Sequence, residues 1–125
     1  MIEDPPLLLV KRAFERAPAP ILKRLEGAQT GHIVDALYGR GALDAGIKPV
    51  DPNRASFVGT ALTVEAGPSD NLAIIAAISV ALPGDVLVVA CDSFQATAVV
   101  GDNVCLMGRN AGVAGIVIDG MARDS

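Results

Sequence analysis

The chain has 125 residues, of which 51% are hydrophobic, 19% are charged and only 3% are aromatic. This length and hydrophobicity indicate one folded domain and exclude an intrinsically disordered chain. The formal net charge is −4, and the 10 Lys and Arg residues are scattered along the sequence. Without a basic stripe interleaved with aromatic residues, nucleic-acid binding is disfavoured.

The sequence shows no signal for a membrane or for secretion. Its longest uncharged apolar run, residues 72–82, is about half of the ~20 residues that a membrane-spanning helix needs. The first four residues, MIED, are acidic where a signal peptide would be basic. Cys91 and Cys105 have neither metal-ligand spacing nor a redox CxxC pattern, which is typical of reduced thiols in an intracellular protein. We therefore expect a cytoplasmic protein with no membrane partner and no nucleic-acid partner.

Two helices are predicted in the first forty residues. Pro5-Pro6 would begin the first helix, and Pro18 and Pro20 would stop it. Between them, the residues with helical spacing are Leu7, Leu8, Val10, Lys11 and Phe14. The second helix is expected to begin at Thr30 and to end before Gly39 and Gly41. Its apolar face would carry Ile33, Val34 and Leu37. A proline-interrupted loop follows over residues 44–54.

The middle of the chain predicts a strand and then a helix. Residues 57–66 alternate as a strand does, with Val58, Leu62 and Val64 pointing inward. Ser69 can cap a helix over residues 70–81, which Pro83-Gly84 would end. The face that this helix presents would carry Leu72, Ile75, Ala76 and Ser79.

The last forty residues predict a βαβ unit. Residues 86–90 form a continuous apolar run after Asp85, which favours a strand buried on both faces. A polar turn, residues 91–93, follows, and a helix is expected to start near Gly101 and to end at residues 110–112. A second buried strand follows over residues 116–119. A strand, a crossover helix and a strand indicate parallel strands, and hence an α/β fold.

The sequence stops one short turn after this second strand, which we expect to be central. A strand edge left open there would be prone to aggregation. We therefore expect residues 1–125 to be the N-terminal part of a single domain. Its C-terminal part would belong to a longer chain or be supplied by another polypeptide.

A candidate site follows from the rule that ligands of parallel sheets bind outside the carboxyl ends of the strands. The polar side chains expected there are Asp92, Asp102, Asp119, Arg123 and Asp124. The helix start at residues 101–104 offers backbone N–H groups to an anion, and Gly101 admits a close approach. Arg123 could clamp a carboxylate, and Asp124 could hold Mg²⁺, which accepts one carboxylate with several waters. Together these groups favour a 2-oxo acid as ligand.

Several other residues carry weaker signals. His32, the only histidine, is expected to be structural or exposed. Asp119 either caps the turn at Gly120 or lies near the site, and Asp92 is expected only to cap its own turn. Cys91 has no partner that would make it a nucleophile. Since no lysine lies at a suitable strand end, a metal route is favoured over a Schiff base.

Three stretches of this sequence resemble the RraA-like family: PGDVLVV at residues 83–89, GDN at 101–103 and GVAGIVIDGMARD at 112–124. Within that family the sequence is similar to the 4-hydroxy-4-methyl-2-oxoglutarate / 4-carboxy-4-hydroxy-2-oxoadipate aldolases. Their signature, an Asp, twenty residues and then Arg-Asp, fits Asp102, residues 103–122 and Arg123-Asp124 without a gap. The resemblance is strong over residues 69–124 and softer earlier in the chain.

The resemblance implies one RraA-like aldolase domain over residues 1–125, with an α/β/α sandwich of the swivelling-domain type. It implies a metal-dependent pyruvate aldolase with possible oxaloacetate decarboxylase activity. Asp102 would orient a catalytic water, Arg123 would contact the substrate, and Asp124 would hold Mg²⁺ or Mn²⁺. The residues that would bind the substrate are Gly101, Asp102, Asn103, Val104 and Arg123. The family also implies homotrimers or homohexamers with sites between subunits.

Two rival functions remain open. The same family includes regulators that inhibit ribonuclease E by protein contact, and such regulators are expected to lack the complete Asp and Arg-Asp set. A methyltransferase acting on a quinone would need an acidic ribose-binding residue after a glycine-rich loop. The sequence shows no convincing loop of that kind.

Overall fold

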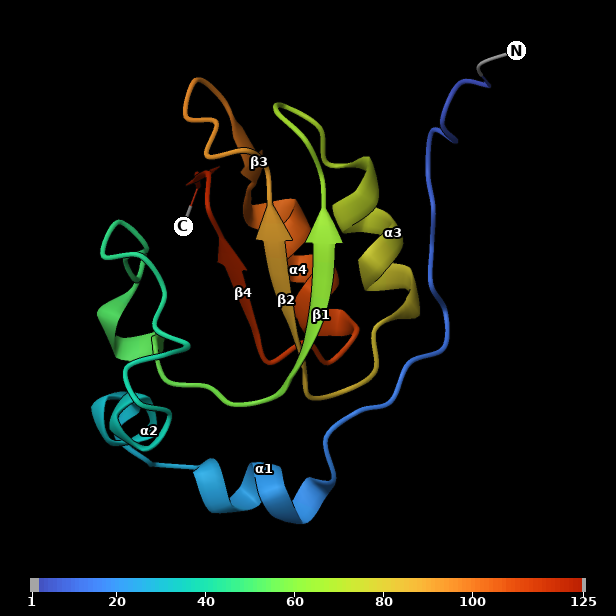
Figure 1. The fold of residues 1–125 in the computed structure, drawn as a ribbon. Helices are drawn as coiled ribbons and strands as arrows, with labels where there is room; N and C mark the ends of the chain where they lie inside the picture. Colours follow the sequence, from blue (N-terminus) through green and yellow to red (C-terminus); the bar gives the residue numbers. More distant parts are fainter. Residues whose placement is uncertain (1–2, 125) are drawn as a thin grey trace.

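The computed structural model describes residues 3–124 and confirms the α/β class. Its main sheet has three parallel strands in the order β1-β2-β4 (Figure 1). These strands are β1 (Thr60–Glu65), β2 (Asp85–Ala90) and β4 (Gly115–Ile118). Two short strands, β3 (Ala98–Val100) and β5 (Met121–Ala122), form a second parallel pair. Within the described residues β4 lies at the edge of the main sheet, whereas β2 is central.

Helices α3 (Leu72–Val80) and α4 (Asp102–Asn110) pack on one face of the main sheet. Leu62 of β1 is level with Leu87 of β2 and points into the same core. Ile74 of α3 and Leu87 have no exposed surface, and burying such a side chain contributes about 1.5–3 kcal/mol. The segment from β2 through α4 to β4, with its two strands parallel, is the βαβ unit that the sequence predicts. The other face is open at β1, where Ala61, Thr63 and Glu65 are exposed.

The predicted helix before Pro18 is wrong. Residues 3–18 form no helix; instead they run past α3 (Figure 1). The first helix is α1 (Ala19–Leu25), and Pro20 lies in its first turn, where a missing N–H does no harm. Pro20 therefore helps to begin a helix rather than to stop one. The predicted second helix is confirmed as α2 (Thr30–Ala36), and a short 3-10 helix, η1 (Pro52–Arg54), lies in the predicted loop.

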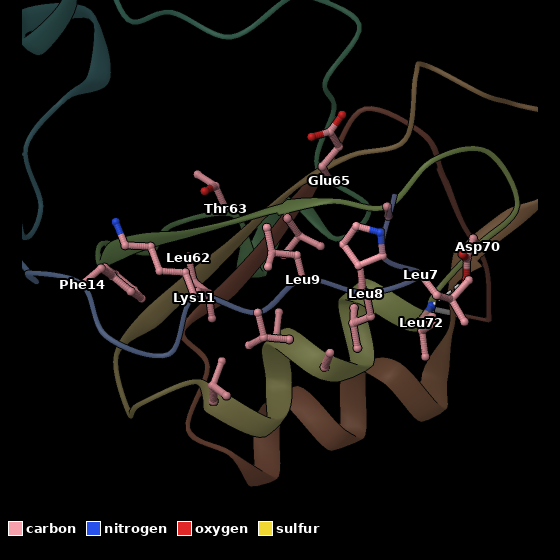
Figure 2. A pocket seen from close by; sticks show the side chains of 18 of the residues that line it. Leu7, Leu8, Leu9, Lys11, Phe14, Leu62, Thr63, Glu65, Asp70 and Leu72 are labelled. Atoms are coloured by element: carbon pink, nitrogen blue, oxygen red, sulfur yellow. Dashed lines mark hydrogen bonds between the residues drawn. The ribbon is translucent and has the colours of Figure 1, made fainter. Parts of the chain in front are cut away.

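The leucines of the N-terminal segment lie along a groove and are not buried in the core. A groove of about 570 Å³ lies between this segment, β1 and α3, and Leu8 and Leu9 line it (Figure 2). Leu7 and Leu9 keep most of their surface exposed. In this segment Phe14 is the hydrophobic residue that packs against the core, so the spacing of the leucines does not mark a buried helical face.

A partly buried ion pair fastens the N-terminal segment to the amino end of β2. Nε and Nη2 of Arg16 each donate to a carboxylate oxygen of Asp85 at 2.8 Å. The backbone N–H of Leu82 also donates to Asp85 at 2.8 Å, and the Asp85 side chain is only 2% exposed. These hydrogen bonds, above all those from Arg16, lower the pKa of Asp85. Nothing in the local pattern around Asp85 had indicated this partner.

Two predictions for α3 are wrong. Its buried residues are Ile74, Ala77 and Ile78, not those of the predicted face, because the sequence LAIIAAISV is apolar on all sides and periodicity cannot select one. Ser69 does not cap the helix. It has a φ of 59°, and its hydroxyl is hydrogen-bonded to Thr97 at 2.7 Å. Asp70 instead accepts a hydrogen bond from the N–H of Leu72 at 2.9 Å.

None of the helices within residues 3–124 combines the length and the apolar character that crossing a bilayer requires.

Candidate active site

The carboxyl ends of the three parallel strands lead into loops that are tied together. The hydroxyl of Ser69, after β1, is hydrogen-bonded to that of Thr97, after β2. Asp119, after β4, accepts hydrogen bonds from the N–H groups of Cys91 and Ser93. These loops carry four of the five non-glycine residues with positive φ among the described residues: Ser69, Asp92, Ser93 and Asp124. Such strained conformations gather at functional sites, so this edge is the strongest candidate for the active site.

The start of α4 lies against the end of the chain that follows β4. Gly101 is the N-cap of α4. A Cβ atom at Gly101 would lie 3.5 Å from Oδ2 of Asp124 and 3.6 Å from Nε of Arg123. The N–H of Arg123 donates to the carbonyl of Val100 at 3.0 Å, which holds the two segments together. The structure thus places Arg123 and Asp124 beside Gly101.

The other predicted site residues lie on the first turn of α4. Asp102 is exposed, and its carboxylate accepts a hydrogen bond from the N–H of Asn103 at 2.7 Å. The side chain of Val104 is buried in the core, so only its backbone can serve a ligand. Asn103 is exposed, but its N–H already donates to Asp102. The start of α4 therefore has one fewer N–H group for an anion than the sequence implied.

The charged pair that ends the described chain is open to solvent. Nε of Arg123 lies 3.3 Å from Oδ2 of Asp124, and the two side chains are 72% and 56% exposed. No group of three or more His, Cys, Asp and Glu side chains that could hold a metal occurs among the described residues. Asp124 therefore offers a single carboxylate. This donor set fits Mg²⁺ or Mn²⁺ bound mainly through water and substrate, and does not fit a closed all-protein site.

Asp119 and Cys91 turn out to be structural neighbours. The two oxygens of Asp119 accept from the N–H groups of Cys91, at 2.7 Å, and Ser93, at 3.1 Å. These hydrogen bonds, chiefly the one from Cys91, lower the pKa of Asp119. Cys91 is 1% exposed, and burial raises the pKa of its thiol, which disfavours a thiolate nucleophile. Asp119 thus caps the 91–93 turn, the role that the sequence assigned to Asp92.

His32 and Lys48 lie outside this site. His32 is an exposed residue of α2, which lies toward the amino end of the sheet (Figure 1). Lys48 lines a cleft of about 890 Å³ that runs along β4 between the loop of residues 43–57 and α4. Arg123 lines the same cleft, whereas Asp102 and Asp124 do not. The cleft therefore reaches the candidate active site at Ser93, Asp119, Gly120 and Arg123.

Comparisons with known proteins agree with this architecture. The model of the RraA-like family, described as "Aldolase/RraA", matches residues 30–125. A protein of Halalkalibacterium halodurans named "Putative 4-hydroxy-4-methyl-2-oxoglutarate aldolase" is 42% identical over 111 residues, which cover 89% of this chain and 52% of that protein. The chain thus spans about half the length of this curated relative.

Two solved structures share the fold. The first is an uncharacterized protein from Pseudomonas syringae pv. tomato, with a TM-score of 0.72 and 30% identity over 94% of this chain and 55% of that one. The second is described as an S-adenosylmethionine: 2-dimethylmenaquinone methyltransferase from Geobacillus kaustophilus. It has a TM-score of 0.68 and 26% identity over 78% of this chain and 60% of that one. Because the family model matches most of the sequence, the chain belongs to the RraA-like family.

Proposed function

We propose that this protein is a lyase of the divalent-metal-dependent aldolase type. Its substrates would be 4-hydroxy-4-methyl-2-oxoglutarate and 4-carboxy-4-hydroxy-2-oxoadipate, cleaved to pyruvate and to pyruvate or oxaloacetate. The name of the relative from Halalkalibacterium halodurans supports this activity at the level of the family. The observation that carries the proposal is that Arg123 and Asp124 lie beside Gly101, at the start of α4.

Arg123 and the start of α4 would bind the C1 carboxylate of the substrate. The N–H groups of the first turn, apart from that of Asn103, which donates to Asp102, would bind an incoming anion. The Arg123 guanidinium lies beside Gly101 and can donate two parallel hydrogen bonds to a carboxylate. Because Gly101 has no side chain, a planar 2-oxo acid could lie directly against the backbone. These groups together orient the C1–C2 end of the substrate.

Asp124 would hold Mg²⁺ or Mn²⁺, with water and the substrate completing the coordination. When bound, such a cation acts as a Lewis acid that polarises the C2 carbonyl. The proton of the C4 hydroxyl leaves to a base, the C3–C4 bond breaks, and C4 becomes the carbonyl carbon of the second product. Arg123 balances the negative charge that develops on the C2 oxygen. A water held by Asp102 then gives C3 its proton, which completes pyruvate.

The same arrangement would decarboxylate oxaloacetate. Breakage of its C3–C4 bond releases carbon dioxide and leaves the same charge on the C2 oxygen, so Arg123 and Asp102 keep their roles.

The proposal includes a cytoplasmic location and assembly into homotrimers or homohexamers with sites between subunits.

Removal of the metal tests the proposed activity. Pyruvate released from 4-hydroxy-4-methyl-2-oxoglutarate is measured by coupling to lactate dehydrogenase, with added MgCl₂ and then with excess EDTA. We expect EDTA to lower the rate by at least about 100-fold, because Lewis-acid stabilisation is worth several kcal/mol, and MgCl₂ to restore it. Release that is unaffected by EDTA, or no release at all, would contradict the proposal. Direct binding to ribonuclease E would then test the regulator alternative.

Substitution of Gly101 tests where the substrate lies. A Cβ atom there would make only ordinary contacts at 3.5–3.6 Å, so Gly101→Ala should leave the melting temperature nearly unchanged. Gly101→Val should raise KM for the oxo acid about tenfold or more, because its branches occupy the space beside Arg123 and obstruct the carboxylate site. Steady-state kinetics of both variants, with circular dichroism to confirm folding, measure this effect. Equal KM values for the wild type and Gly101→Val would show that the substrate lies elsewhere.

The methyltransferase name of the Geobacillus kaustophilus structure suggests a second activity, which this site does not favour. Binding a nucleoside cofactor in such a sheet usually requires a glycine-rich turn after a strand and then an acidic ribose-binding residue. In this chain the loop at residues 66–71 has one glycine, and residues 91–97 have none.

A further inference from the structure

The turn between β4 and β5 is fastened to the turn after β2 at two adjacent residues, Asp119 and Gly120. Asp119 accepts backbone hydrogen bonds from both Cys91 and Ser93. A Cβ atom on Gly120 would overlap the sulfur of Cys91 and would lie 3.1 Å from the carbonyl oxygen of Phe94. We call this pair of contacts the 119–120 clamp. One part is a charged hydrogen-bond acceptor, and the other is a close approach that a side chain would block.

The residues that follow the clamp have few other anchors. The strand β5 has only two residues, Met121–Ala122, and its pairing with β3 is irregular. Arg123 is held by one backbone hydrogen bond, to Val100, while its side chain is largely exposed. Asp124 has a φ of 59°, a conformation that surrounding structure must maintain. The direction in which the chain leaves β4 therefore determines where Arg123 and Asp124 lie relative to Gly101.

We propose that Asp119 is a positioning residue of the active site, whose carboxylate holds Arg123 and Asp124 against the start of α4. Both of its oxygens are occupied by backbone N–H groups, so it acts through the chain and not as a catalytic base. Hydrogen bonds to a carboxylate are about twice as strong as those to a neutral acceptor, which explains why an aspartate suits this position. The catalytic consequence rests on the proposed function, whereas the effect on the backbone does not.

Asp119→Asn tests the clamp, because asparagine keeps the size of the side chain but has one acceptor oxygen and no charge. The first readout is amide hydrogen exchange of Arg123, whose N–H donates to Val100. We expect exchange at least about tenfold faster than in the wild type, the effect of losing one charged hydrogen bond. The second readout is paramagnetic broadening of the Gly101 amide signal by Mn²⁺ alone. We expect Mn²⁺ affinity to fall about 10- to 100-fold, as when a group that orients a metal ligand is lost.

Asp70→Asn is the matched control, since Asp70 also accepts a backbone hydrogen bond in a loop at this edge of the sheet, from Leu72. It should change neither readout. Asp119→Glu keeps the charge. Its Arg123 exchange rate and its Mn²⁺ affinity should lie between those of the wild type and those of Asp119→Asn. This variant tests the clamp even if Asp119→Asn is poorly folded.

The outcomes separate this inference from the proposed function. Faster exchange of Arg123 in Asp119→Asn, with weaker Mn²⁺ binding, supports both. If exchange is faster in Asp119→Asn but the wild type neither binds Mn²⁺ nor releases pyruvate, the clamp is supported and the proposed function is overturned. Unchanged exchange of Arg123 in both Asp119 variants, or equally fast exchange in Asp70→Asn, overturns the clamp whatever the activity.

Discussion

Replacing Arg123 by alanine is expected to lower kcat for pyruvate release about 100- to 1,000-fold, the effect of removing one donor that stabilises a developing oxyanion. The side chain is 72% exposed, so its loss should change the free energy of unfolding by less than about 0.5 kcal/mol. Arg123→Lys should recover only part of the activity, because lysine keeps the charge but lacks the planar pair of donors. Coupled steady-state assays with urea unfolding of each variant measure both effects.

His32→Ala is the control for this prediction, because His32 is exposed on α2, a helix that lies toward the amino end of the sheet (Figure 1). It should leave kcat within about a factor of two of the wild type.

Asp124→Ala should also reduce turnover by orders of magnitude, and should raise the Mg²⁺ concentration needed for half-maximal rate. Comparable losses in Arg123→Ala, Asp124→Ala and His32→Ala would mean that the chemistry occurs elsewhere.

Replacing Asp85 by asparagine is expected to lower the free energy of unfolding by about 3 kcal/mol, since removing one partner of a buried ion pair is strongly destabilising. The change would leave Arg16, which is 23% exposed, facing a neutral side chain in place of a carboxylate that is 2% exposed. It would loosen the N-terminal segment from the sheet. Asp51→Asn is the matched control. Asp51 forms an exposed ion pair with Arg54 at 3.5 Å, and its substitution should change stability by at most about 1 kcal/mol.

The stability difference between wild type and Asp85→Asn should depend on pH. The pKa of Asp85 is lower in the folded protein than its ordinary value of 3.8. The unfolded chain therefore binds the proton more tightly than the folded protein does. The contribution of the ion pair is therefore fully present above about pH 5. It is lost progressively below about pH 4, as the pH falls through the folded pKa. Urea unfolding at pH 7, 5, 4 and 3 measures this loss. A stability difference that stays constant across this range would show that ionisation of Asp85 is not its source.

The predictions that held depend on signals within a few residues. The apolar run after Asp85 predicted β2, and Gly101 marked the start of α4. The βαβ order placed Gly101 and the Arg123-Asp124 pair at one sheet edge, where the structure has them side by side. The predictions that failed lacked such a signal. A uniformly apolar α3 has no preferred face, and the spacing of Leu7 and Leu8 suits a helix as well as an extended segment along a groove.

By itself the sequence determined the class of the fold, the position of β1, β2, α4 and β4, and the family signature of Asp102 with Arg123-Asp124. These depend on side-chain periodicity, on glycine and proline, and on spacing along the chain, all of which are local. Only the tertiary structure decided that Arg16 pairs with Asp85, 69 residues away, and that Asp119 holds a turn 28 residues before it. A buried carboxylate takes whichever donor the fold brings to it, and that donor is chosen by packing between distant segments.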